Sequence, residues 1–277
     1  MAVPLTTVSE EIELELLLEA IHRRYGFDFR DYATASLRRR LGRRMNLEGL
    51  QSLSELQGLL LRDPACMERL LIDLSINVTA MFRDPSFYRA FRAQVVPFLH
   101  TYPFTRIWCA GCSTGEEVYS LAILLHEEGL YERARIYATD INEYALEAAR
   151  SGVFPLARMR DYTENYIRGG GTGDFSEYYV AAYDAARFRR DLIENVVFAQ
   201  HNLATDRSFN EFHVIICRNV LIYFDTPLQH RVSELFDSSL CHLGVIGLGR
   251  KESLAFTPVA DRFTALDLDE RIYRKVA

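Results

Sequence analysis

The amino-acid sequence predicts an α/β protein in which an all-helical N-terminal domain precedes a sheet of mostly parallel strands. Apolar residues recur at helical spacing from Glu10 to about Leu74, and no strand-like segment interrupts them. From Arg106 onward, short β-prone segments alternate with helical ones, which is typical of a parallel sheet covered by helices on both faces. A stretch rich in glycine and tyrosine, Tyr162–Arg190, breaks this alternation and predicts an inserted subdomain.

The composition is that of a globular protein from a reducing compartment. The chain has 277 residues, of which 49% are hydrophobic and 25% charged, enough for a substantial core. No apolar run reaches the ~18 residues of a membrane span, and the acidic N-terminal stretch does not resemble a secretory signal. The five cysteines are odd in number and scattered, which argues against a disulfide framework. We expect a cytoplasmic monomer that does not insert into a membrane. The net charge of −6 excludes global attraction to nucleic acid, so we expect no nucleic-acid partner.

The N-terminal helical domain is expected to span residues 1–75. Thr7 and Glu10 match a capping box at the start of a first amphipathic helix. A second helix near Thr34–Leu47 carries several arginines around an apolar face. The Asp63-Pro64 pair separates two further helical segments.

The sheet domain is expected to span residues 76–277. Its helical segments are Glu116–Leu130 and Glu143–Arg150. Its expected strands are Arg106–Ala110, Arg135–Thr139, Asn195–Ala199, His213–Cys217, Val245–Leu248 and Arg271–Val276. The insertion covers about residues 160–192 and shows no good helix pattern. Because a structureless loop of this length is unusual in a compact domain, we predict a small β-subdomain there.

The turn after the first predicted strand is the best candidate for a cofactor site. It reads Ala110-Gly111-Cys112-Ser113-Thr114-Gly115, where glycines let backbone N–H groups approach a ligand. Glu116 and Glu117 follow at once; they would repel a pyrophosphate but suit a ligand with an ammonium group. Asp140 ends the second strand, where a carboxylate can accept both hydroxyls of a ribose. The pattern favours S-adenosylmethionine over NAD.

Two other interpretations of this turn remain open. Gly111, Ser113 and Gly115 spell the G-x-S-x-G of a hydrolase nucleophile elbow, but such an elbow normally follows several strands, and only helical sequence precedes this one. Cys109 and Cys112 form a C-x-x-C pair that could be redox-active or could simply fill space. No second pair or histidine cluster completes a metal site, so we expect no metal.

Five segments in order make the chain similar to the chemotaxis receptor methyltransferases, the CheR family. The segments are Asn77–Asp84, Ser113–Ser120, Ala138–Ile141, Ala149–Gly152 and Cys217–Asp225. The resemblance spans roughly residues 10 to 277. Met81 and Val118 depart from the residues usual in the family, and Gly249-Arg250-Lys251-Glu252-Ser253 stands where the family commonly has G-H-S-E.

The resemblance implies a Rossmann-like, S-adenosylmethionine-dependent methyltransferase domain that forms glutamyl methyl esters and releases S-adenosylhomocysteine. The family's cofactor contacts fall on Asn77, Thr79, Arg83, Glu116, Asp140, Asn202, Leu203, Asn219 and Val220. Arg83 would also orient the substrate carboxylate through its planar guanidinium, and Tyr223 would donate a hydrogen bond beside it. A non-catalytic cofactor-binding module, or a methyltransferase with another substrate, remains an alternative.

The resemblance also implies that the partners are methyl-accepting chemotaxis receptors. A solvated face is the simplest interpretation of the arginine-rich helix on composition alone. In the family, the N-terminal domain faces receptor helices that carry glutamates, so the arginines of this helix would align the receptor helices. The arginines are Arg38, Arg39, Arg40, Arg43 and Arg44. The glycines of the insertion would admit an extended C-terminal receptor tail: Gly169, Gly170, Gly171 and Gly173.

Overall fold

The computed structural model describes residues 5–74 and 79–276 and divides into two compact units. The smaller, helical unit comprises Met1–Ile76 and Ile222–Arg231, and the larger comprises Asn77–Leu221 and Val232–Ala277. The sequence analysis assigned residues 222–231 to the sheet domain, whereas the structure groups them with the helices. Hydrogen bonds hold them there, from the Ala33 N–H to the Tyr223 carbonyl (2.9 Å) and from the Asp225 N–H to the Asp31 carbonyl (2.9 Å).

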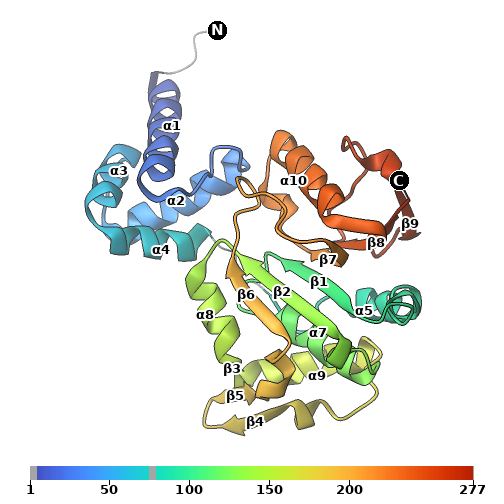
Figure 1. Cartoon of the computed structure of the whole chain (residues 1–277). Helices are drawn as coiled ribbons and strands as arrows, with labels where there is room; N and C mark the ends of the chain where they lie inside the picture. The colour runs from blue at the N-terminus through green and yellow to red at the C-terminus, as the bar shows by residue number, and fades with distance from the viewer. Residues whose placement is uncertain (1–4, 75–78, 277) are drawn as a thin grey trace. The chain divides into compact units, whose positions relative to one another are not determined.

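The described N-terminal part of the helical unit folds into α1 (Leu5–Tyr25), α2 (Thr34–Glu48), α3 (Leu53–Arg62) and α4 (Pro64–Leu74), labelled in Figure 1. Their apolar stripes supply its core, with Leu17, Leu41, Leu56 and Leu70 fully buried. The predicted capping box at Thr7 is wrong, because α1 begins at Leu5 and Thr7 lies inside it. The Asp63-Pro64 break is confirmed, since α3 ends before it and proline opens α4.

The larger unit is built on a seven-stranded sheet in the order β6-β2-β1-β7-β8-β10-β9. Five neighbouring strands are parallel: β1 (Thr105–Ala110), β2 (Ala134–Asp140), β6 (Val196–Gln200), β7 (Phe212–Cys217) and β8 (Leu240–Leu248). β9 (Phe263–Asp267) and β10 (Ile272–Lys275) close one edge antiparallel. Ile107, Ile136 and Val214 on the central strands are fully buried, as a sheet covered on both faces requires.

The helices of this unit are α5 (Pro85–Gln94), α6 (Val96–Leu99), α7 (Glu116–Glu127), α8 (Glu143–Ser151), α9 (Met159–Arg168) and α10 (Thr226–Ser239), whose first turns belong to the helical unit. Every strand predicted from the sequence is present in this sheet, and α7 and α8 match the two predicted helices. The sequence analysis did not identify β9, α9 or α10.

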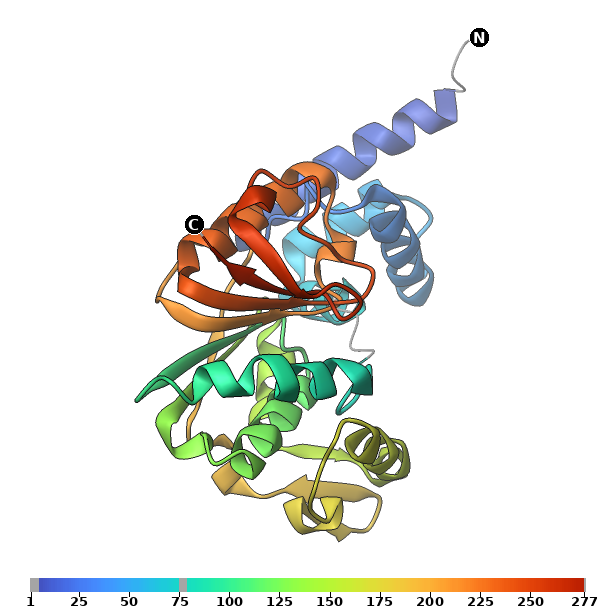
Figure 2. The ribbon, with the colours of Figure 1, turned by 90° about the vertical axis from the view of Figure 1, so that its right-hand side faces the viewer.

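The insertion is a second sheet of three short antiparallel strands in the order β3-β5-β4: β3 (Val153–Pro155), β4 (Tyr179–Ala182) and β5 (Ala185–Phe188). Figures 1 and 2 both show it at the lower end of the larger unit, beside α9. The statement that the insertion has no helix pattern is wrong. α9 buries Met159, Tyr162 and Tyr166 at helical spacing, and its polar residues obscured that pattern.

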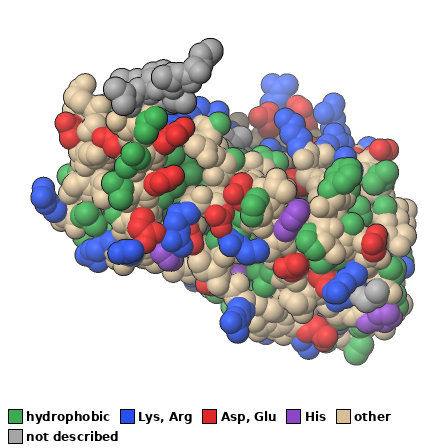
Figure 3. Space-filling view, turned by 90° about the horizontal axis from the view of Figure 1, so that it is seen from above, with side chains coloured by type: hydrophobic (Ala, Val, Ile, Leu, Met, Phe, Trp, Pro, Cys, Tyr) green, Lys and Arg blue, Asp and Glu red, His purple; other side chains and the backbone are tan. Residues whose placement is uncertain are grey.

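The surface carries both signs of charge. On the face seen in Figure 3, acidic and basic side chains are interspersed, with single hydrophobic side chains between them. Among the residues that the structure describes, none of the helices has the length and hydropathy of a membrane span.

Candidate cofactor site at the carboxyl edge of the sheet

Four parallel strands end at one edge of the sheet, and each is followed by residues that the sequence predicts to bind a ligand. β1 leads into Gly111, β2 ends at Asp140, β6 leads into Asn202 and β7 leads into Asn219. Because carboxyl ends of parallel strands meet at one edge, the topology brings these four residues together.

The glycine turn after β1 is bound to β2 rather than open to a ligand. The N–H groups of Gly111 and Cys112 both donate to the carbonyl of Thr139, at 2.8 and 2.9 Å. These two N–H groups of the loop therefore bind the protein itself. Glycine is needed at 111 for another reason: its φ is +77°, and a Cβ there would lie 2.5 Å from Cγ2 of Val220. The turn and Val220 consequently pack in direct contact.

Asp140 is the residue that connects the turn to the end of β2. Its Oδ2 accepts the Ser113 N–H at 2.8 Å, and its Oδ1 accepts the Asn142 N–H at 3.0 Å. Burial raises the pKa of Asp140, and these two backbone donors act in the opposite direction. The Ile141 N–H also bonds this carboxylate, and because a carboxylate has about four lone-pair sites, it can still accept from a hydroxyl group of a ligand.

Glu116, the first residue of α7, presents a buried carboxylate at the same edge. Its Oε2 accepts the Thr114 hydroxyl at 2.6 Å, and its Oε1 accepts the Tyr162 hydroxyl at 3.3 Å. Burial raises the pKa of Glu116 above its usual range, against the opposing effect of the Thr114 hydrogen bond. A positively charged ligand group beside it would favour the ionised form.

Two asparagines bring buried polar atoms that have no protein partner. Among the described residues, Nδ2 of Asn202 and Oδ1 of Asn219 are buried without a hydrogen bond. Buried amide atoms normally find partners, so the two point to a polar ligand. Asn219 adopts a left-handed backbone with φ of +62°, and its N–H donates to Oε2 of Glu252 at 2.9 Å. Leu203 and Val220, which follow the asparagines, are both half-buried.

The segment that precedes α5 holds the remaining predicted cofactor residues. The carbonyl of Thr79 accepts from Nη2 of Arg158 at 3.0 Å, and the carbonyl of Arg83 accepts from Nη2 of Arg218 at 3.1 Å. Arg83 is half-buried. Asn77 lies outside the described residues.

Tyr223 belongs to the helical unit, where the guanidinium of Arg40 lies over its ring at 4.8 Å from the centroid. Arg40 is buried and also donates to the carbonyl of Leu74. Arg44 is buried as well, and its Nε donates to Asp73 at 2.7 Å. Neither arginine is on the surface, so the prediction that both contact a partner directly is corrected. Arg38, Arg39 and Arg43 remain at least partly exposed.

The glycines of the insertion lie between α9 and β4 and pack against the protein itself. A Cβ on Gly171 would overlap the ring of Tyr166. The Gly173 N–H donates to the Tyr166 hydroxyl at 2.8 Å, and that hydroxyl donates to Glu127. Gly169 and Gly170 end α9. The outer strands of the small sheet are β3 and β4, and Val180 of β4 is 69% exposed.

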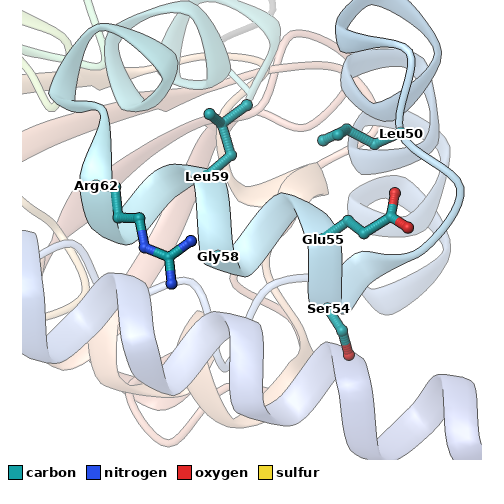
Figure 4. A pocket seen from close by; sticks show the side chains of 6 residues that line it. All are labelled: Leu50, Ser54, Glu55, Gly58, Leu59 and Arg62. Carbon is teal, nitrogen blue, oxygen red and sulfur yellow. The ribbon is translucent and has the colours of Figure 1, made fainter.

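A pocket in the helical unit, shown in Figure 4, is separate from this edge. It is lined by Leu50, Ser54, Glu55, Gly58, Leu59 and Arg62. Its polar groups are engaged locally, since Ser54 donates to Glu13 at 2.6 Å and Glu55 accepts the Gln51 N–H at 2.8 Å. Within the described residues, no group of histidine, cysteine and acidic side chains could hold a metal ion.

Three residues at the sheet edge were missed by the sequence analysis. Tyr162 reaches Glu116 from α9, Arg218 contacts the Arg83 segment, and Glu252 fixes the backbone of Asn219. Arg218 lies in the family-like segment Cys217–Asp225, and Glu252 lies in Gly249–Ser253, which departs from the family pattern. The sequence therefore pointed to both segments but gave neither residue a role. The glutamate of that stretch keeps a buried position despite the substitutions around it.

The groups at the edge fit S-adenosylmethionine. A buried carboxylate, Glu116, suits an ammonium; a second, Asp140, retains lone pairs for a ribose diol. The unpaired Asn202 and Asn219 atoms suit the polar edge of a base. Acidic groups in these places would disfavour a ligand whose phosphates approach the turn.

Comparison with known proteins agrees with this chemistry. Residues 77–272 match the family described as CheR methyltransferase, SAM binding domain, and residues 12–75 match CheR methyltransferase, all-alpha domain. The chain is 50% identical to "Putative methyltransferase Cher3" of Pseudomonas putida over 96% of this chain and 97% of that one. It is 32% identical to "Chemotaxis protein methyltransferase 2" of Pseudomonas aeruginosa (87% and 86%) and 30% identical to the "Chemotaxis protein methyltransferase" of Listeria innocua (84% and 87%). The protein therefore belongs to the CheR family of S-adenosylmethionine-dependent methyltransferases.

Proposed function

We propose that this protein methylates glutamate side chains of methyl-accepting chemotaxis receptors and so forms glutamyl methyl esters. The names of the relatives from Pseudomonas aeruginosa and Listeria innocua, both chemotaxis protein methyltransferases, support this substrate. The observation that carries the proposal is the contact of Arg83 with Arg218. The Arg83 carbonyl accepts a hydrogen bond from the residue that directly precedes Asn219. This bond holds the backbone of Arg83 beside the cofactor edge, and in the proposal its guanidinium, whose shape suits a carboxylate, orients the acceptor.

The reaction needs little acid–base help from the protein. A glutamate acceptor has an ordinary pKa of about 4.3 and is already ionised at neutral pH. S-adenosylmethionine supplies a methyl group on a sulfonium, which departs as a neutral thioether. The protein then has to align the two reacting groups and keep water away from them. No general base is required, which agrees with the absence of a histidine motif from the sequence.

Each predicted residue has a role in this proposal. Glu116 holds the amine end of the cofactor, and Asp140 accepts its ribose hydroxyls. Thr79, Asn202, Leu203, Asn219 and Val220, with Asn77, line the remainder of the cofactor site. Arg83 orients the acceptor carboxylate, and the family resemblance gives Tyr223 the role of a hydrogen-bond donor.

Receptor recognition is assigned to two surfaces, each within one unit. On α2, the exposed Arg39 and Arg43 and the half-buried Arg38 attract the glutamate-bearing receptor helices. In the insertion, the unpaired edge of β4 accepts an extended receptor tail by strand addition. The Gly173 N–H is bound to Tyr166 of α9 and Glu127 of α7.

The test is transfer of labelled methyl groups from S-adenosylmethionine to receptor-containing membranes, followed by alkali. Glutamyl methyl esters release methanol, and we expect this release from the wild-type protein. Arg83→Ala should lower the rate by orders of magnitude, because misorientation alone costs about a hundredfold. Affinity for S-adenosylhomocysteine should fall much less, since Glu116 and Asp140 remain. Arg83→Lys should restore little of the methyl-transfer rate, because one ammonium group cannot reproduce the planar set of donors of a guanidinium.

Three results would contradict the proposal. Methyl groups stable to alkali would mean another kind of acceptor. Cofactor binding without any transfer would mean a non-catalytic module. Parallel loss of activity and cofactor affinity in Arg83→Ala would make Arg83 a cofactor ligand only.

A further inference from the structure

The segment that carries Arg83 has an unusual backbone. Phe82 has φ of +50° and Asp84 has φ of +55°, so Arg83 stands between two non-glycine residues in the left-handed region. For an aromatic residue such as Phe82 this conformation is a steric outlier. Strained backbone of this kind persists only where surrounding contacts impose it, and it gathers at functional sites.

Contacts from two helices, α7 and α9, impose the conformation on the side before Arg83. The Phe82 N–H donates to Oγ of Ser120 on α7 at 2.8 Å. Nδ2 of Asn165 on α9 donates to the carbonyl of Met81 at 3.1 Å. The Phe82 ring is fully buried and packs edge-on against Tyr166 at 5.3 Å between centroids.

Arg218 holds the other side. Its Nη2 donates to Oδ2 of Asp84 at 2.7 Å and to the carbonyl of Arg83 at 3.1 Å. Its Nη1 donates to Oε1 of Glu117 at 2.8 Å, and its guanidinium lies over the Phe87 ring at 4.2 Å from the centroid. The Arg218 side chain is only 2% exposed, so the guanidinium end of both ion pairs is shielded from water. One buried guanidinium thus connects the end of β7, the first turn of α7 and the strained segment.

We propose that Arg218 is a positioning residue that sets the direction of Arg83 relative to the cofactor groups. The inference rests on the proposed function, in which Arg83 orients the acceptor carboxylate. Arg218 precedes Asn219 in the chain, and its partner Glu117 follows Glu116. Its bonds to Arg83 and Asp84 therefore fix the substrate-orienting segment to two groups that hold the cofactor. Lysine cannot replace it, because a single ammonium does not present donors in a plane to three separate acceptors.

The experiment uses the full chain and measures kcat for methyl transfer, affinity for S-adenosylhomocysteine and thermal stability. Arg218→Met should lower kcat at least tenfold while changing cofactor affinity less than threefold. Arg218→Lys keeps the positive charge between Asp84 and Glu117, so it should recover stability without recovering kcat. The matched control is Arg92→Met, since Arg92 is also a largely buried arginine paired with two carboxylates, Glu127 and Glu128. It should lose stability and retain kcat.

A double variant separates positioning from general structural damage. If Arg218 acts through Arg83, then Arg83→Ala with Arg218→Met should be no slower than Arg83→Ala alone. Rate losses that multiply, or a kcat loss in Arg92→Met as large as in Arg218→Met, would overturn the inference. Retained activity in Arg83→Ala would instead overturn the orienting role that the proposed function gives to Arg83, and methyl groups stable to alkali would overturn the proposed function itself. If Arg218→Met does not fold, the same cycle is run with Arg218→Lys.

Discussion

The carboxylate of Asp140 accepts the backbone N–H of Ser113 at 2.8 Å, across the ends of β2 and β1. A second bond from the Asn142 N–H occupies its other oxygen at 3.0 Å. The side chain therefore shapes the turn after β1 and still offers lone pairs to a ligand. Its loss should affect both the turn and the cofactor.

We expect Asp140→Ala to weaken S-adenosylhomocysteine binding by about 2–3 kcal/mol, taking ~1 kcal/mol or more for each charge-assisted hydrogen bond to the ribose. Thermal stability should also fall, because the Ser113 and Asn142 N–H groups lose their acceptor. Asp140→Asn keeps one acceptor oxygen, so its cofactor affinity and its thermal stability should lie between those of the wild type and Asp140→Ala. Calorimetry on the folded variants measures the affinity. An unchanged affinity in Asp140→Ala would remove this residue from the site.

Glu116 should make cofactor affinity depend on pH. Burial raises its pKa, so the folded protein binds this proton more tightly than the unfolded chain does. The free energy of unfolding of the cofactor-free protein should therefore fall as the pH rises from the Glu116 pKa of the unfolded chain through the higher pKa of the folded protein. Below the pKa of the unfolded chain, Glu116 is protonated in both states and has no such effect. Glu116→Gln should raise the melting temperature of the cofactor-free protein at neutral pH and weaken cofactor binding. In the wild type, affinity should fall as the pH drops through the folded pKa, and the variant should lack this step. A pH step shared by both proteins would assign the titration to another group.

The arginines of α2 should separate into buried ones that stabilise the fold and exposed ones that bind the receptor. Arg44 is buried with Asp73, and removing one partner of a buried ion pair typically costs about 3–5 kcal/mol. Arg44→Met should therefore lower the melting temperature strongly. The Arg43 side chain is 72% exposed and its Nε lies 3.9 Å from the same Asp73, so Arg43→Glu should lower the melting temperature much less than Arg44→Met does. It should raise KM for receptor membranes, with a smaller effect at higher salt. Equal methylation kinetics in Arg43→Glu and wild type would show that this face does not meet the receptor.

A receptor tail should bind the small sheet at β4 rather than at the glycines. We expect a C-terminal aromatic–acidic pentapeptide to shift the NMR amide signals of Tyr179–Ala182, because this strand has an unpaired edge. Val180→Glu should weaken the acidic peptide through charge repulsion at an exposed position. A scrambled peptide of the same composition is the control. No shift and no heat at high micromolar peptide would mean that receptors are found without the tail.

Local sequence pattern was sufficient for the architecture and for part of the site. Strand segments such as Arg135–Thr139 and helices such as Glu116–Leu130 follow from side-chain periodicity, which depends only on near neighbours. Asp140 and Glu116 could be chosen because a strand end and a helix start can be read locally. α9 was missed because its buried tyrosines alternate with charged residues, and β9 because an edge strand has a weak apolar pattern.

The remaining features of the site depend on partners distant in the chain, and only the tertiary structure decided them. Arg218 bonds to Asp84, 134 positions away, and Gly111 is limited to glycine by the side chain of Val220. The burial of Arg40 and Arg44 follows from the packing of α2 on Leu74 and Asp73. A sequence shows which residues carry charge, whereas burial and pairing arise only when separate elements pack together. For that reason the family, the fold and the cofactor class could be inferred from the sequence, whereas the exposure of the arginines and the contacts around the Arg83 backbone depend on how the elements pack.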